Sequence, residues 1–225
     1  MAKKVLTDNL SEPLNGVTTA RVDINAGDGN LTIDRLTGGE QVLASGRLQY
    51  LENQGLPTRT LVSSGDQATL TLRGSQDVRP RFRLPWAACN GATEWQVHLN
   101  PTVSSDITAH SNGGNVKLNL DGMIITRISA DTGGGNIDIV LPGNAANLSV
   151  HAKTGAGNAV VSIPSGFAAR IHATTGLGKT IVDPQFNQID KNTYQSPGFD
   201  TAANKVEITV HSGAGNVSVN TRRET

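Results

Sequence analysis

The chain has 225 residues, which is long enough to bury a sizeable core, and its 19 lysine and arginine residues balance its 19 aspartate and glutamate residues. A zero formal net charge provides no overall field that would draw the protein to nucleic acid or to an anionic membrane. The single cysteine, Cys89, excludes an internal disulfide bond and a cysteine-rich metal site.

The amino-terminal residues carry no recognisable export or membrane signal. Lys3 and Lys4 are not followed by an apolar run, and no later stretch approaches about 18 consecutive apolar residues. We therefore interpret residues 1–14 as an amino-terminal tail and expect a cytoplasmic location, with membrane association only through a partner.

Glycine-rich turns recur along the chain and divide it into repeats. The turns have the pattern Gly-x-Gly-Asn or a close variant, and their last residues are Asn30, Asn115, Asn136, Asn158, Lys179 and Asn216. From Asn115 to Lys179 the spacings are 21, 22 and 21 residues, whereas the two flanking spacings are 85 and 37 residues. A period of this length is typical of a repeat protein, and the two long spacings indicate insertions.

The spacing also predicts the domain organisation, which is a single domain over residues 15–220. Its parts are an irregular amino-terminal part at 35–106, regular repeats at 107–184, an insertion at 185–204 and a final repeat at 205–220. Residues 221–225 are interpreted as a carboxy-terminal tail. Within the irregular part, the pattern predicts strands over 41–50 and 67–72 and a loop over 79–86.

Apolar and polar residues alternate on both sides of the turns, as they do in β-strands with one buried face. Val116, Leu118 and Leu120 follow one turn, and a glycine or proline then marks a second corner. Each repeat is therefore predicted to form two strands joined by a glycine corner, and we call this unit a rung. The whole chain predicts an all-β solenoid of stacked two-strand rungs, nearly free of helices. Because each rung contacts its neighbours, a disturbance at Gly157 is expected to spread first through residues 130–182.

The corner residues are expected to have a structural role. Glycine permits a positive φ and the close approach of another backbone, and asparagine can bond neighbouring backbone through its side chain. Asn115, Asn136 and Asn158 should stack as an amide ladder, in which Lys179 replaces asparagine. The predicted structural turn residues are Gly29, Asn30, Gly114, Asn115, Gly135, Asn136, Gly157, Asn158, Gly178, Lys179, Gly215 and Asn216.

Residues 20–24, 27–33 and 94–101, together with the Gly-Gly-Gly-Asn turn at 133–136, resemble the toast-rack domain over residues 15–220. In bacteria, the toast-rack domain resembles the soluble half of cell-wall-antibiotic-response and related "putative adhesin" proteins. In those proteins the soluble half is often attached to membrane helices. The resemblance implies a β-solenoid without established catalytic residues. It also implies a protein-interaction module with a role in cell envelope stress.

Two motifs resemble ligand-binding loops but fit the repeat better. Residues 173–180 match a permissive phosphate-loop pattern, yet such a loop must open a helix, and this segment is in register with the preceding turn. Residues 133–138 resemble a calcium-binding repeat, which needs recurring aspartates. Lys117, Ala159 and Ile181 stand at the places that recurring aspartates would need. Asp28 and Asp138 are therefore expected to be solvated, and no cofactor, metal ion or nucleotide is expected.

Histidines and arginines form two further candidate groups. His151 and His172 have equivalent positions in neighbouring repeats, and so do His110 and His211, which predicts a surface stripe of histidines. No carboxylate or cysteine recurs beside them, so exposed polar residues are favoured over a zinc site. Four arginines could contact an anionic ligand, although flanking prolines favour a solvated loop anchored by Trp86. They are Arg73, Arg79, Arg81 and Arg83, with Phe82 interleaved.

Polysaccharide cleavage on a solenoid face would need converging carboxylates or a basic residue beside them. The candidates are Asp131, Asp138, Lys117, Arg127 and Arg170. These residues lie at ordinary outward positions, so no catalytic residue is assigned and an enzyme is not expected. The favoured function is a non-enzymatic structural or protein-interaction module, with a carbohydrate-binding or adhesive module and a polysaccharide-cleaving enzyme as alternatives. The expected partner is an unidentified protein, which could be associated with a membrane. Binding to nucleic acid is not expected. The sequence is compatible with a monomer or a homo-oligomer.

Overall fold

The computed structural model describes residues 4–38, 41–74, 93–143 and 147–222, and nearly all of its regular structure is β-strand. In chain order the strands are β1 (Val5–Pro13), β2 (Thr19–Asn25), β3 (Asn30–Arg35), β4 (Val42–Leu51), β5 (Thr58–Ser64), β6 (Gln67–Arg73), β7 (Glu94–Leu99), β8 (Ser104–Ser111), β9 (Val116–Asn119), β10 (Ile125–Thr132), β11 (Ile137–Val140), β12 (Leu148–Ala156), β13 (Ala159–Pro164), β14 (Ala168–Leu177), β15 (Thr180–Val182), β16 (Asn187–Gln188), β17 (Thr193–Gln195), β18 (Lys205–Ala214) and β19 (Val217–Arg222). In these described ranges, the helical segments are two short 3-10 turns, η1 (Glu52–Gln54) and η2 (Phe199–Thr201). Within the described residues, no helix has the length and apolar character needed to cross a membrane. The predicted all-β fold is confirmed.

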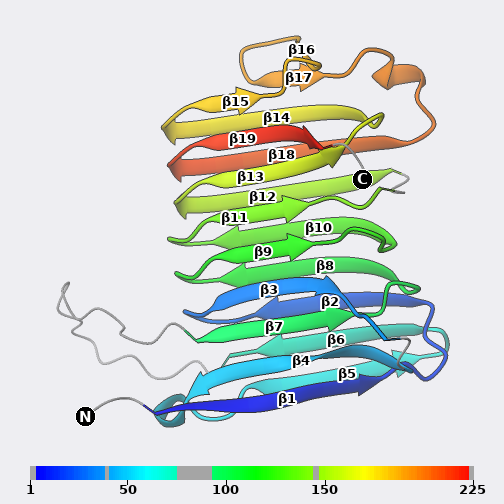
Figure 1. The fold of residues 1–225 in the computed structure, drawn as a ribbon, viewed down its shortest axis with the longest axis vertical. Helices are drawn as coiled ribbons and strands as arrows, with labels where there is room; N and C mark the ends of the chain where they lie inside the picture. The colour runs from blue at the N-terminus through cyan, green and yellow to red at the C-terminus, as the bar shows by residue number, and fades with distance from the viewer. Residues whose placement is uncertain (1–3, 39–40, 75–92, 144–146, 223–225) are drawn as a thin grey trace.

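The strands form two sheets that enclose the apolar core (Figure 1). Sheet A has the strand order β1-β4-β7-β3-β9-β11-β13-β19-β15. Sheet B has the order β16-β17-β14-β18-β12-β10-β8-β2-β6-β5. Each rung gives one strand to each sheet: β8 runs in sheet B, a glycine corner follows, and β9 returns in sheet A.

Neighbouring rungs pair in parallel and in register, so equivalent side chains lie above one another. One buried column in sheet B consists of Val22, Ile107, Ile128, Val150, Ile208 and Ile171. The facing column in sheet A consists of Ile33, Leu118, Ile139, Val161 and Val219. Burial of one such side chain contributes about 1.5–3 kcal/mol, and no rung covers its own column. The apolar core therefore depends on the stack as a whole.

The order of the rungs in space differs from their order in the chain. β18 lies between β12 and β14, and β19 lies between β13 and β15. At the other end, β2 and β3 are likewise inserted between β6 and β7 on one side and β8 and β9 on the other. The expectation that a disturbance at Gly157 spreads first through residues 130–182 assumed that the rungs stack in chain order, and that order is wrong. The neighbours of Gly157 are the rung at 125–140 and the final rung at 205–222, and residues 168–182 lie one rung further away.

The amino-terminal end of the stack contains a strand that the repeat does not predict. Residues 5–13, interpreted from the sequence as tail, form β1, which pairs antiparallel with β4. Its alternation is hidden because Asp8 and Glu12 share the face of the buried Leu10. The predicted strands at 41–50 and 67–72 are confirmed as β4 and β6.

The insertion at 185–204 closes the other end. It contains β16, β17 and η2, and β17 adds to sheet B antiparallel to β14. Two phenylalanines of this segment bury their rings: Phe186 is 4% exposed and packs on the core, and Phe199 is 2% exposed. The insertion is therefore a cap, and we use that name for residues 183–204 below.

We expect Gly157→Val to be far more damaging than Asn158→Ser. A β-carbon at Gly157 would lie 2.2 Å from the carbonyl oxygen of Gly135, so one of the two corners must move. Such strain costs about 1–3 kcal/mol, with a side chain beyond Cβ adding to it, whereas loss of one hydrogen bond at Asn158 costs roughly 1 kcal/mol. Hydrogen exchange followed by NMR should accelerate first in residues 125–140 and 205–222. Acceleration in 168–182 before 205–222, or equal effects of both substitutions, would contradict the rung order.

Candidate functional site

A row of polar residues runs along the corner side of the stack. The backbone N–H of Asn30, in the first of these rungs, donates to the Thr93 carbonyl at 2.8 Å, whereas the N–H of each other residue donates to the side-chain Oδ1 of its counterpart in the adjacent rung. These bonds run from Asn115 to Asn30, Asn136 to Asn115, Asn158 to Asn136, Asn216 to Asn158 and Lys179 to Asn216, with lengths of 2.8–2.9 Å. We call these six residues the asparagine edge. The structure thus brings the predicted corner residues of all six rungs into one column.

The asparagine edge differs from the expected amide ladder in the nature of its bonds. Side chains bond mainly to backbone, because a corner N–H that points along the stack needs an acceptor. A direct amide to amide bond within the edge runs from Asn115 Nδ2 to Asn30 Oδ1 at 3.2 Å. The other edge asparagines form no Nδ2 hydrogen bond with any described residue.

Lys179 occupies the last position of the asparagine edge. Its backbone N–H donates to Asn216 like that of any other edge residue after Asn30. Among the described strands, β15 is the last of sheet A, so no further described rung needs an acceptor from the Lys179 side chain. The same placement argues against a phosphate loop at 173–180, because this segment forms the end of β14, a corner and β15 rather than the start of a helix.

A second row of bonds lies buried behind the asparagine edge, and the reasoning from sequence missed it. Serine and threonine hydroxyls donate to glycine carbonyls of the adjacent rung: Ser111 to Gly29, Thr132 to Gly114, Thr154 to Gly135, Ser212 to Gly157 and Thr175 to Gly215, at 2.7–2.8 Å. A serine or threonine stands four residues before five of the six edge positions, and Ala26 stands there in the first rung. This recurrence is a signal that the sequence does carry.

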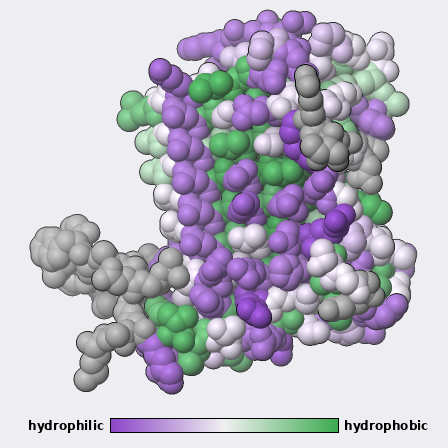
Figure 2. All heavy atoms as spheres, viewed as in Figure 1, coloured by the Kyte–Doolittle hydropathy of each residue, from purple (hydrophilic) through white to green (hydrophobic). Residues whose placement is uncertain are grey.

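The surface of the molecule reflects this arrangement. Figure 2 shows a hydrophilic column along one side of the stack, and the edge residues of the inner rungs are exposed. The asparagine edge is therefore a straight, regularly spaced and accessible row of polar groups. Neighbouring positions are separated by about 4.8 Å, the spacing of paired strands.

The histidines do not form the predicted continuous stripe. His151 and His172 both face β18, where Thr209 lies between them, because the final rung is inserted there. His110 lies opposite Asp131, and His211 lies opposite Lys153 and contacts Thr174. Among the described residues, no group of three or more His, Cys, Asp or Glu side chains could hold a metal ion.

The carboxylate and basic residues considered for catalysis are divided between the two sheets. Asp138 and Lys117 are neighbours on sheet A, whereas Asp131 and Arg127 lie on β10 of sheet B. Arg127 pairs with Asp106 at 3.7 Å. The set therefore does not converge on one place.

The remaining candidates have separate surroundings. Asp28 is exposed at the first corner, and Asp138 is half-buried on β11. Arg73 pairs with Asp23 at 3.2 Å. Arg79, Arg81, Arg83, Phe82 and Trp86, as well as Cys89, lie outside the described residues.

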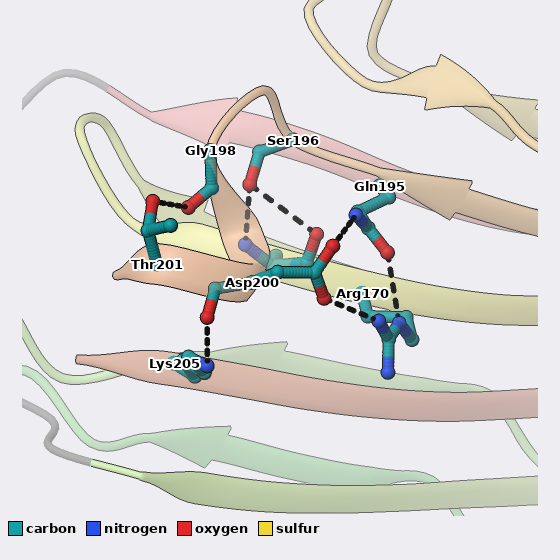
Figure 3. Close-up of polar contacts among 8 residues, drawn as sticks. Arg170, Gln195, Ser196, Gly198, Asp200, Thr201 and Lys205 are labelled. Carbon is teal, nitrogen blue, oxygen red and sulfur yellow. Dashed lines mark hydrogen bonds and ion pairs between the residues drawn. The ribbon is translucent and has the colours of Figure 1, made fainter. Parts of the chain in front are cut away.

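The reasoning from sequence also missed a cluster where the chain crosses from the cap to β18 (Figure 3). The guanidinium of Arg170, on β14, bonds to Asp200 Oδ1 at 3.0 Å and to Gln195 Oε1 at 2.9 Å. Lys205 Nζ donates to the Asp200 carbonyl at 2.8 Å. The ring of Phe199 lies beneath the Arg170 guanidinium at 4.4 Å and near Lys205 at 5.4 Å. We call this cluster the clasp, because it ties η2 to β14 and β18.

At the start of the cap, hydrogen bonds hold the pKa of Asp183 below its ordinary value of 3.8. The largest cause is the backbone N–H of Gln185, which donates to Asp183 Oδ1 at 3.1 Å. Thr221 adds a backbone bond at 3.2 Å from the end of β19. The ionised carboxylate thus joins the cap to the final rung.

We expect Asp183→Asn to destabilise the protein near neutral pH, with a difference that shrinks in acid. A carboxyl group whose folded pKa is lowered contributes stability above its unfolded pKa and loses that contribution as the pH falls through the folded value. The gap in unfolding free energy between the parent and variant should therefore close as the pH falls from about 5 through 3.8 and below. Urea unfolding at several pH values measures it, and a gap that widens in acid would contradict this role.

We expect Asn158→Lys to destabilise the protein by about 1 kcal/mol and Lys179→Asn to change its stability by only a few tenths. The first change removes the acceptor for the Asn216 N–H, whereas the second alters a side chain that no further rung uses. Urea unfolding of the two variants is the measurement. Equal destabilisation would show that Lys179 does not mark the end of the edge.

Comparison with known proteins identifies the family. No curated protein matches the chain in sequence. The crystal structure of "a putative cell adhesion protein" from Clostridium sporogenes is 22% identical and shares the fold, with a TM-score of 0.86 over 97% of this chain and 100% of that one. A "putative adhesin" from Bacteroides fragilis is 14% identical, with a TM-score of 0.37 over 97% of this chain and 98% of that one. The family described as "N-terminal domain of toast_rack, DUF2154" matches residues 1–162, and the chain therefore belongs to the toast-rack family.

Proposed function

We propose that this protein is a non-enzymatic interaction module that binds a protein partner along its asparagine edge, as part of the bacterial response to cell envelope stress. The observation that carries the proposal is the row of exposed Asn136, Asn158 and Asn216 side chains, whose Nδ2 donors no described residue occupies. The row is rigid because each Oδ1 is held by the N–H of the next rung. A rigid donor row loses little conformational freedom when a partner binds.

Two further observations support an interaction module over an enzyme. Membership of the toast-rack family agrees with a structural or adhesive role. The carboxylates considered for polysaccharide cleavage lie on different sheets, so they do not form the paired arrangement that glycoside hydrolysis needs. The link to envelope stress rests on the family alone.

The observations favour a protein over a carbohydrate as the partner. Carbohydrate-binding surfaces commonly present exposed aromatic rings. Trp95 is 1% exposed, and its Nε1 donates to the Gln49 carbonyl at 2.9 Å inside the fold. Tyr50 and Tyr194 are half-buried. Within the described residues, no tryptophan or tyrosine forms an exposed platform.

A photo-crosslinking amino acid placed at Gly134 tests the proposal in bacterial cells that express the protein. Gly134 lies in a corner beside the asparagine edge, and a β-carbon there would be 3.9 Å from its nearest neighbour, so a side chain fits. The control position is the exposed Thr209, on the outer face of sheet B.

We expect a discrete protein adduct from Gly134 that is weaker or absent from Thr209, and that is lost when Asn136→Ala is added. Mass spectrometry would identify the adduct. Adducts that carry glycan instead of protein would favour the adhesive alternative. Equal labelling from both positions would reject the asparagine edge as the binding surface.

A further inference from the structure

The final rung, residues 205–222, fills a slot between two rungs that precede it in the chain. β18 pairs in parallel with β12 over residues 148–156 and with β14 over residues 168–177. β19 pairs in the same way with β13 and β15. The inward residues of the final rung are buried by the rungs on both sides. Those residues, Val206, Ile208, Val210, Val217 and Val219, are 0–2% exposed.

The two walls of the slot present the same pattern in the same register. Val150 and Ile171 both face Ile208. On one side the Ser212 hydroxyl donates to the Gly157 carbonyl, and on the other the Thr175 hydroxyl donates to the Gly215 carbonyl, each at 2.7 Å. The bonds of the slot thus depend on the sequence of the rung that fills it, and not on which chain supplies that rung.

The segment that connects β17 to the final rung passes from one side of β14 to the other at the start of that strand. β17 pairs with one side of β14 and β18 with the other, so residues 196–204 must pass over the strand end. The clasp holds this crossing (Figure 3). Its ion pair is largely exposed, with 41% of the Arg170 side chain and 76% of the Asp200 side chain accessible. Exposed ion pairs contribute little, so the crossing is held far more weakly than the rung itself.

We propose that two copies of this chain can exchange residues 205–222, so that the slot of each copy is filled by β18 and β19 of the other. The paired strands, the buried column and the corner bonds are the same in the monomer and in the exchanged dimer. The two states differ mainly in the path of residues 196–204. In the monomer this segment returns the final rung to the slot of its own chain, and in the dimer it extends to the slot of the other copy. Exchange of identical elements is a low-cost route to a dimer. The inference does not depend on the proposed partner or on the asparagine edge.

Protein concentration during folding should decide between the two states. In the monomer the rung is tethered to its own slot, and the tether gives it a high effective concentration. Insertion of the final rung into the slot of another copy therefore competes with insertion into its own slot only when the chain concentration approaches that effective concentration. Weakening the clasp removes contacts that favour the path of the segment in the monomer, so it should shift the balance toward the dimer.

The test refolds the full-length chain from urea at low micromolar and at near-millimolar concentration, and measures mass by light scattering after size exclusion. We expect monomer from the dilute sample and a dimer fraction from the concentrated one. Asp200→Ala should raise that fraction about two- to fivefold. The matched control is Asp190→Ala, a change of the same chemistry in the cap, where the carboxylate bonds to Asn192 rather than to the clasp. It should leave the dimer fraction unchanged.

A cysteine pair identifies the exchanged rung. His172 and Thr209 face each other across β14 and β18, so His172→Cys with Thr209→Cys, in a Cys89→Ser background, places two thiols within disulfide reach. In an exchanged dimer oxidation joins the two chains, and non-reducing electrophoresis shows a covalent dimer. Disulfide bonds formed only within single chains would overturn the proposal. So would a monomer at every concentration for both the parent protein and Asp200→Ala.

Discussion

Successive corners of the stack approach one another so closely that a β-carbon has no room between them. At Gly114, Gly135, Gly157, Gly178 and Gly215, a β-carbon would lie 2.0–2.2 Å from the carbonyl oxygen of the adjacent corner. This contact fixes the distance between rungs on the corner side. It also brings the buried hydroxyls and the asparagine side chains within bonding distance of the next rung. The apolar columns then stack because the corners have set their register.

The two ends of the stack solve the problem of unpaired strands in different ways. At the amino-terminal end, Asp8 and Glu12 on the edge strand β1 face inward, where a further stacked strand would have to bury them. At the other end, the cap adds β17 to sheet B and buries Phe186, while Lys179 ends the row of acceptors. A solenoid needs such ends because its inner rungs present the same surface on both sides. The asparagine edge is thus finite, with a defined start at Asn30.

The sequence predicts the rungs well and their order poorly, for one physical reason. A strand with the right alternation fits beside any other such strand: Ala156 and Leu177, from different rungs, both pair with Ala214. The period therefore carries no information about which rung lies next in space. β1 was missed because charged residues occupy its inward positions. The hydroxyl row could have been predicted from the recurring serine and threonine, but Arg170 and Asp200 of the clasp lie in different repeats and share no local pattern.

The corner bonds join the rungs in their spatial order. NMR couplings across hydrogen bonds test this order directly, because they connect an amide nitrogen to the carbonyl carbon of its acceptor. We expect correlations from the Asn216 amide to the side-chain carbonyl of Asn158, and from the Lys179 amide to that of Asn216. A correlation from the Lys179 amide to Asn158 would instead place the rungs in chain order and contradict the insertion of residues 205–222 between them.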